Sequence, residues 1–305
     1  MKIENFSKEV KGALEQRTEC TVEEMRIRKN NGVMLYAITL KDDGINIAPT
    51  IYLEDYFDNY REYNWSIEQV ADKIVEIYNK YRFEHNVNMD FFTNYETAKQ
   101  RIVYKLINFD RNKYLLEEIP YVRFQDLAIV FYYLVDEDEF SNATILITNR
   151  HLDGWGVSTE EIYTVAKENA PKLLKASLLG MMQVLKGLVE ENIFTEEEVG
   201  DSVLELFEDD NCGMYVLSNS TRLYGAGAIL YDYILKEFAD KMQSNLFILP
   251  SSIHEVIIIP DKDHITKTKL QGMVKEVNET QVAEQEVLSD SVYYFDRNTN
   301  KIEIA

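Results

Sequence analysis

The sequence predicts an α+β protein of mixed α/β character: a small amino-terminal unit of helices and a hairpin, then a larger mixed sheet covered by helices. Two observations support this prediction. In the first third of the chain, helical apolar spacing flanks a segment in which apolar and polar residues alternate. From residue 101 onward, short apolar runs typical of strands alternate with helical segments. We therefore expect two domains, residues 1–98 and 99–305.

The elements of the amino-terminal unit follow from apolar spacing and from turn and capping residues. Asn31-Gly32 suits the positive φ angles of a tight turn between two strands. Ser66 with Gln69 three residues later has the pattern of a capping box, which starts a helix. The expected elements are a helix over residues 3–17, hairpin strands at 21–29 and 33–41, and a helix over 67–84.

The larger unit is predicted from apolar runs and a second capping box. Ser158 with Glu161 is expected to begin a helix that ends near residue 169, and Pro171 to open another helix with an apolar face through Leu178 and Met182. The expected strands are residues 102–108, 121–124, 127–135, 143–148, 213–217, 246–249 and 256–259. The remaining elements are helices over 225–242 and 267–282 and a hairpin of 291–295 with 301–304.

Composition excludes some classes of protein. The 305 residues carry a formal charge of -21, which argues against binding to duplex nucleic acid through a broad basic face. Cys20 and Cys212 lie too far apart for a disulfide scaffold or a zinc knuckle, and we expect reduced thiols. The polar amino terminus and the lack of an 18-residue apolar run predict a cytoplasmic protein without a membrane segment.

One concentrated group of reactive side chains lies between two predicted strands, at Ser252, His254 and Glu255. Serine, histidine and glutamate are the residue types that supply the nucleophile, base and acid of many hydrolases. Strand residues alternate between faces, however, so Ser252 and His254 are expected on one side and Glu255 on the other. The alternative interpretation is a set of polar residues that close a hairpin.

Two junctions form a second candidate site. Residues 145–149 and 215–219 are apolar strands that end in a hydroxyl residue and an asparagine, and a loop, a glycine and a helix follow each. Two copies of one β-loop-α unit, or two unrelated junctions, fit this pattern. Such junctions bind anions in α/β sheets; in the alternative interpretation the asparagines form Asx turns. The residues concerned are Asn149, Trp155, Asn219 and Arg222, with Arg150 as a further cation.

Metal and cofactor binding are not expected. None of the four histidines stands four residues from another, and the acidic run at 136–139 lacks the spacing of a calcium loop. The segment from Gly187 to Thr221 contains ten acidic residues and no Lys or Arg. We expect residues 190–210, the acidic segment, to form a solvated face or to contact a basic protein surface.

Six runs of residues together resemble an uncharacterised domain-of-unknown-function family of gut Firmicutes. These runs are residues 124–132, 147–149, 155–157, 214–219, 225–231 and 249–256. The order of the later elements is also distantly similar to the YtpQ family of Firmicutes. The resemblance implies that residues 100–260 fold as one block, and it supplies no catalytic residues.

Three functional hypotheses follow. The leading one is a cytoplasmic interaction or regulatory protein without catalytic activity, because the chain is acidic and tyrosine-rich and lacks catalytic motifs. The first alternative is a hydrolase or small-ligand enzyme with a pocket near His254, which requires Asn149, Asn219 and His254 to meet at one cleft. The second is an acidic mimic of DNA that acts on a nucleic-acid-binding protein.

Overall fold

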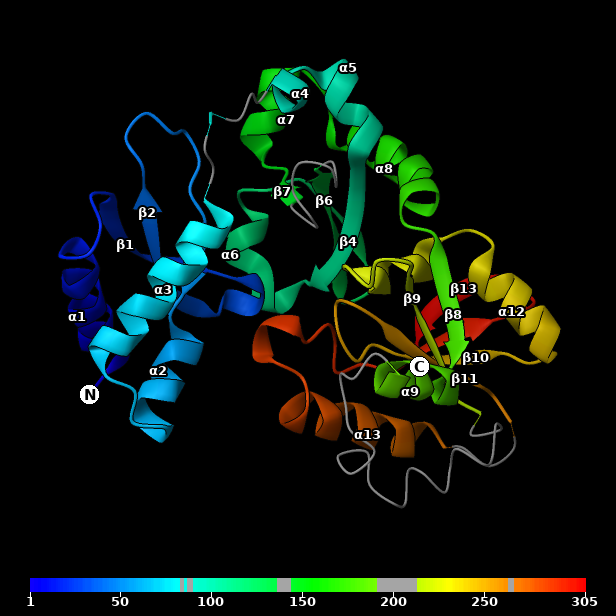
Figure 1. Ribbon diagram of the computed structural model, residues 1–305. Coiled ribbons are helices and arrows are strands. Elements are labelled where there is room, and N and C mark those ends of the chain that lie inside the picture. Colours follow the sequence, from blue (N-terminus) through cyan, green and yellow to red (C-terminus); the bar gives the residue numbers. More distant parts are fainter. Residues whose placement is uncertain (83–84, 87–89, 136–143, 191–212, 263–265) are drawn as a thin grey trace. The chain divides into compact units, whose positions relative to one another are not determined.

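The computed structural model describes residues 1–82, 85–86, 90–135, 144–190, 213–262 and 266–305 (Figure 1). Contacts divide the chain into two compact units, Met1–Phe91 and Phe92–Ala305, whereas the sequence predicts a division after residue 98. In the described residues, the strands form three antiparallel sheets with helices packed on them. The predicted α+β fold class is therefore confirmed.

The first unit is a three-stranded sheet covered by helices. Its elements are α1 (Ile3–Glu15), β1 (Thr21–Arg28), η1 (Asn30–Gly32), β2 (Met34–Lys41), β3 (Thr50–Tyr52), α2 (Glu54–Glu62) and α3 (Ile67–Tyr81). The predicted hairpin is confirmed, with positive φ at Asn31 and Gly32. The predicted capping box at Ser66 and Gln69 begins α3. Apolar side chains of α1, the sheet and α3 form one core.

The second unit contains a four-stranded sheet in which β6 is central and buried along its whole length. Its strands are β4 (Ile102–Asn108), β5 (Tyr121–Phe124), β6 (Leu127–Leu134) and β7 (Thr144–Leu146). The helix α8 (Thr159–Leu173) packs on β4 and begins at the predicted Ser158–Glu161 capping box. The shorter elements are α4 (Asp90–Thr93), α5 (Tyr95–Ala98), η2 (Lys99–Arg101), η3 (Asp110–Asn112), α6 (Lys113–Leu116) and α7 (Asn149–Trp155).

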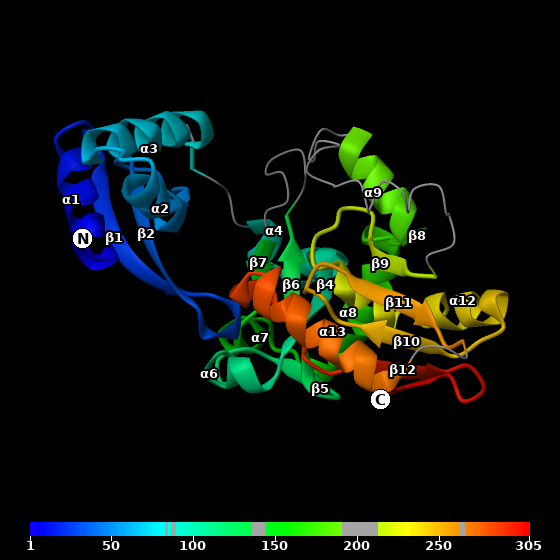
Figure 2. The same cartoon turned by 90° about the horizontal axis from the view of Figure 1, so that it is seen from below.

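The same unit contains a six-stranded sheet of order β13-β12-β10-β11-β9-β8 (Figures 1 and 2). Its strands are β8 (Ala176–Gly180), β9 (Tyr215–Asn219), β10 (Leu246–Leu249), β11 (Val256–Pro260), β12 (Tyr293–Asp296) and β13 (Lys301–Ile304). The helical elements around it are α9 (Met181–Glu190), η4 (Gly225–Leu230), α12 (Ile234–Met242), α13 (Lys267–Thr280) and η5 (Glu284–Glu286). The carboxy-terminal helix and hairpin agree with the sequence prediction.

Opposite faces of the six-stranded sheet carry different helices. On one face, Leu270 of α13 packs against Phe247 of β10. On the other, Phe238 of α12 packs against Tyr215 with ring centroids 4.7 Å apart. Successive strand residues point to opposite faces, so Val216 lies on the α13 face. The helix α9 contacts β8 and β9.

Two predictions about helices are wrong. Pro171 lies inside α8 and opens no new helix, and the apolar run after it forms strand β8, which pairs with β9. A short apolar run does not distinguish strand from helix by periodicity alone. The helix expected over residues 225–242 is two elements, the 3₁₀ turn η4 and then α12.

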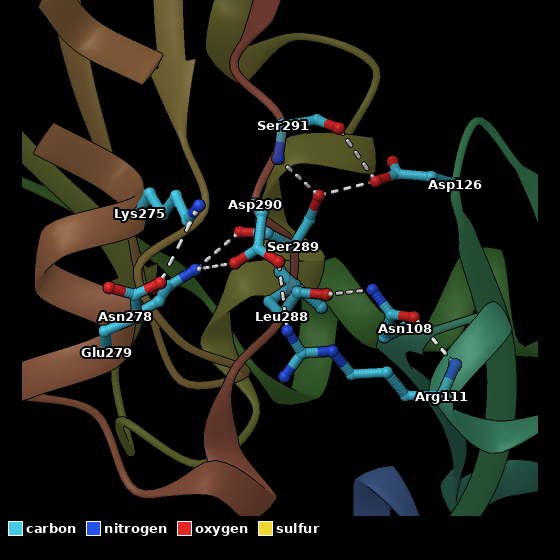
Figure 3. A network of polar contacts seen from close by, with 10 residues as sticks. All are labelled: Asn108, Arg111, Asp126, Lys275, Asn278, Glu279, Leu288, Ser289, Asp290 and Ser291. Carbon is cyan, nitrogen blue, oxygen red and sulfur yellow. Dashed lines mark hydrogen bonds and ion pairs between the residues drawn. The ribbon is translucent and has the colours of Figure 1, made fainter. Parts of the chain in front are cut away.

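A polar network ties the segment Leu288–Ser291 to the four-stranded sheet and to α13 (Figure 3). The Asn108 side chain donates to the carbonyl of Leu288 at 3.1 Å, and Asn278 Nδ2 donates at 2.9 Å to both the Ser289 carbonyl and Asp290 Oδ1. Asp126, at the turn between β5 and β6, accepts hydrogen bonds from the Ser289 and Ser291 hydroxyls. Because Tyr293 of β12 also donates to Asp126, hydrogen bonds join the two sheets of this unit.

Candidate functional site

Five of the seven predicted site residues gather at one corner of the six-stranded sheet. Asn219 ends β9, Arg222 follows in the next loop, and Ser252, His254 and Glu255 occupy the connection from β10 to β11. The other two lie on α7. Asn149 Nδ2 donates to the Glu117 carbonyl, and Trp155 Nε1 donates to the Phe92 carbonyl, each at 3.2 Å.

The side chain of Asn219 shapes the 219–225 loop, the stretch of chain between β9 and η4. It is only 3% exposed. Its Oδ1 accepts from the amide and the hydroxyl of Thr221, at 3.1 and 3.0 Å, and its Nδ2 donates to the Leu223 carbonyl at 2.7 Å. Asn219 therefore forms the Asx turn of the alternative interpretation. Asn149 instead begins α7, so the two asparagines have different roles.

The 219–225 loop holds unusual backbone conformations. Arg222 and Tyr224 have φ angles of 54° and 53°, in the left-handed region that residues other than glycine rarely adopt. At Gly225, an added Cβ would lie 2.1 Å from Ser218 Oγ and 2.5 Å from the carbonyl oxygen of His254. Such strain persists only where the surroundings fix the chain, and it is concentrated at functional sites.

The expected placement of Ser252, His254 and Glu255 is wrong. These residues precede β11 and form a turn in which the Ser252 amide donates to the Glu255 carbonyl. The alternation of a strand therefore does not apply. The Ser252 hydroxyl donates to Glu255 Oε1 at 2.8 Å, so these two side chains meet.

The ring of His254 points to the 219–225 loop. Its Nδ1 lies 3.1 Å from the Arg222 carbonyl oxygen and 3.3 Å from the Tyr224 amide nitrogen, and either tautomer satisfies one of them. The ring also stacks on Tyr224, and the Lys105 ammonium lies 3.8 Å from the centroid of the Tyr224 ring. Because Ser252 Oγ bonds to the backbone amide of His254 rather than to its ring, the three residues form no catalytic triad.

A cavity of about 460 Å³ lies at this corner, and Asn219, Arg222 and Glu255 are among the residues that line it. One part of its wall is an apolar row across three strands, because Val216 pairs with Leu179 on one side and Ile257 on the other. Ligand pockets commonly measure roughly 300–1,000 Å³. The volume therefore suits a small organic molecule.

A polar row runs beside the apolar one. Ser177 pairs with Ser218, so both lie on the same face of the sheet as Leu179 and Val216, and Glu255, which directly precedes β11, lines the same cavity. Ser251, in the connection from β10 to β11, also lines the cavity. The cavity wall is thus divided into an apolar part, which the α9 side chains Met181, Val184 and Leu185 extend, and a polar part.

The polar part contains two opposite charges that do not neutralise each other. Arg222 is exposed, and its guanidinium forms no hydrogen bond or ion pair with any residue that the structure describes. Glu255 is half-buried and accepts a hydrogen bond from Ser252. A cation and a carboxylate are therefore both available to a bound molecule.

Sequence reasoning missed the wall that β8 and α9 provide. The apolar spacing predicts a helix through Ala176–Gly180, although the placement of Ser177 and Leu179 on one face is also compatible with the strand observed. Only the pairing with β9 brings these residues to Asn219 and Arg222.

Other predicted features carry no site in the described residues. There, no group of three or more His, Cys, Asp or Glu side chains is arranged to hold a metal ion. None of the described helices combines the length and the apolar character needed to cross a membrane. The acidic residues 136–139 and the acidic segment from residue 191 onward lie outside the described part of the chain.

The fold and the cavity define an α+β protein with a candidate small-molecule site between a sheet and a helix. The chain belongs to a family of unknown function, DUF5688, whose sequence profile matches residues 3–297. No curated protein and no solved structure gave a significant match.

Proposed function

We propose that this protein is a non-catalytic binding protein that recognises a small amphipathic molecule in the cavity formed by β8, β9, β11 and α9. The observation that carries the proposal is the division of the cavity wall. An apolar row through Val216 lies beside a polar row through Ser218, and Arg222 and Glu255 stand at the polar part.

The side chains at the corner support binding rather than catalysis. The His254 ring is held on the 219–225 loop, and the Ser252 hydroxyl is bonded to Glu255. A nucleophile needs a base within hydrogen-bond reach, and Ser252 has no such contact with the imidazole. A hydrolase built from these residues is therefore the less favoured alternative.

The test uses 8-anilinonaphthalene-1-sulfonate as a fluorescent probe, because it joins apolar rings to an anionic group. We expect saturable binding to the full chain at one site. Leu179→Trp places a larger side chain in the cavity and should weaken probe binding at least about tenfold. Because Leu179 is 40% exposed, we expect the fold to tolerate the change.

Leu173→Trp is the matched control, because Leu173 ends α8, is similarly exposed at 37% and does not line the cavity. It should leave the probe affinity unchanged. Equal affinity of the wild type and Leu179→Trp would contradict the proposal.

The other functional hypotheses stay predictions. Contact of the acidic segment with a basic protein surface, and mimicry of DNA, concern residues outside the described part of the chain. The cytoplasmic location, the origin in Firmicutes and the likeness to the YtpQ family likewise remain predictions from the sequence.

A further inference from the structure

We infer that the cavity's ligand is an apolar zwitterion, a molecule with a carboxylate, an ammonium group and a hydrocarbon side chain, as in a free hydrophobic amino acid. This inference rests on the proposed function and names its ligand class. It depends on the two charges at the polar part of the cavity and on the size and chemistry of the apolar part.

Arg222 fits the carboxylate of such a ligand. Its guanidinium has no partner among the described residues, and a guanidinium binds a carboxylate through two parallel hydrogen bonds. The 219–225 loop fixes the backbone of Arg222, since Asn219 bonds to Leu223 on one side and His254 lies against the Arg222 carbonyl on the other. The strained φ of 54° is held by these contacts.

Glu255 fits the ammonium group. Ser252 donates to its Oε1, which leaves acceptor capacity on the carboxylate for a further donor. Arg222 and Glu255 form no ion pair with each other, although both line the cavity. A purely anionic ligand, such as the fluorescent probe, pairs with Arg222 alone, and a purely cationic one with Glu255 alone, whereas a zwitterion pairs with both.

The apolar row fits the side chain. Leu179, Val216 and Ile257 stand opposite one another across three strands, and apolar side chains of α9 line the same cavity. The volume of about 460 Å³ exceeds that of one amino acid, so it also accommodates a dipeptide. An uncharged hydrocarbon would leave the Arg222 and Glu255 charges without partners.

The test displaces the fluorescent probe with L-leucine, L-phenylalanine and two analogues. Leucinamide lacks the carboxylate and N-acetyl-leucine lacks the ammonium group. We expect both amino acids to displace the probe and each analogue to bind about tenfold or more weakly. Arg222→Gln should weaken the binding of leucine but not that of leucinamide, which has no carboxylate to lose. Glu255→Gln should weaken the binding of leucine but not that of N-acetyl-leucine, which has no ammonium group.

Arg150→Gln is the matched control, because Arg150 is an exposed arginine on α7 that does not line the cavity. It should change no affinity. Far-UV circular dichroism and urea unfolding are used to check that each variant is folded.

The outcomes separate the two proposals. If the probe binds in the cavity but neither amino acid displaces it, or if both analogues bind as well as leucine, the zwitterion inference is overturned and the proposed function stands. If Leu179→Trp leaves probe binding unchanged, both are overturned.

Discussion

Gly225 shows why a single residue type is required beside the cavity. Its missing side chain lets η4 begin against Ser218 and His254, where any Cβ would overlap three atoms at 2.1 to 2.6 Å. One of them is a backbone nitrogen and one a carbonyl oxygen, which cannot rotate away.

Gly225→Ala should therefore lower the free energy of unfolding by about 2–4 kcal/mol, the range of severe overpacking. Urea unfolding measures this change. Gly272→Ala is the control, because Gly272 lies inside α13 with open space around it, and it should gain about 0.5–1 kcal/mol from helix propensity. Equal stability of Gly225→Ala and wild type would contradict the close approach.

His151 provides a pH-dependent element at residue scale. Its Nδ1 accepts from the Thr148 amide at 3.0 Å, and its ring packs edge-on against Phe92. Burial lowers the pKa of His151 below its usual value. The folded state thus favours the neutral ring more than the unfolded state does. The contribution of His151 to the free energy of unfolding is therefore complete above about pH 6.5, and it is lost as the pH falls through the unfolded and then the folded pKa of this ring.

His151→Gln retains a capping acceptor that does not titrate. We expect the free energy of unfolding of the wild type to fall more steeply between pH 7.5 and 5.5 than that of the variant, as measured by urea unfolding at each pH. Parallel pH profiles would show that His151 makes no such contribution.

Residue type and local sequence pattern identify some, but not all, of the residues that line the cavity. The sequence predicts Asn219 and Arg222 at one candidate site and Glu255 at another, and in the structure all three line one cavity. Asn149 has the same sequence context as Asn219, yet its side chain donates to the Glu117 carbonyl and does not line the cavity. Local pattern does not determine which strand ends become neighbours, because that depends on sheet order.

At the scale of elements, the segment Leu288–Ser291 has no regular structure and is held by side chains. Asp126 accepts from three hydroxyls, those of Ser289 at 2.5 Å, Ser291 at 3.1 Å and Tyr293 at 2.5 Å. Tyr293 and Ser289 are fully buried, so loss of Asp126 leaves two buried hydroxyl donors without their acceptor.

Asp126→Ala should accordingly lower the free energy of unfolding by about 2–4 kcal/mol. Asp261→Ala is a matched control, since Asp261 accepts one hydroxyl, that of Tyr294, at an exposed site, and its loss should cost less than about 1 kcal/mol. Both are measured by chemical denaturation. A cost below 1 kcal/mol for Asp126→Ala would mean that the segment is held by other contacts.

The elements that sequence reasoning predicted have local determinants. The capping boxes at Ser66 and Ser158, and the Asn31-Gly32 turn, are complete within a few residues. The strand β8 has none, because its conformation is decided by pairing with β9, which follows only after α9 and the undescribed residues 191–212. The part of the cavity wall that β8 forms was therefore not predictable from local pattern.

At the scale of the whole molecule, the two units have separate cores. The first core joins side chains between Ile3 and Tyr78, among them Phe6, Leu14, Ile38 and Ile74, which are fully buried. We propose that this unit folds by itself, in keeping with the domain organisation expected from the sequence.

A fragment of residues 1–91 should then unfold cooperatively in urea and show helical circular dichroism. Ile74→Ala should destabilise it by about 2–5 kcal/mol, since Ile74 is 0% exposed. Exposed Ile77→Ala is the control and should cost much less. A fragment without a cooperative transition would contradict independent folding.

The central claim is that the cavity beside α9 binds a small amphipathic molecule. The most direct measurement is a methyl NMR titration of the full chain, labelled at Ile, Leu, Val and Met methyl groups, with 8-anilinonaphthalene-1-sulfonate. We predict saturable shifts concentrated at Leu179, Val184, Leu185, Val216 and Ile257, with the core methyls of Ile38 and Ile74 unchanged. Shifts confined to other methyl groups, or no saturable shift at all, would contradict the claim.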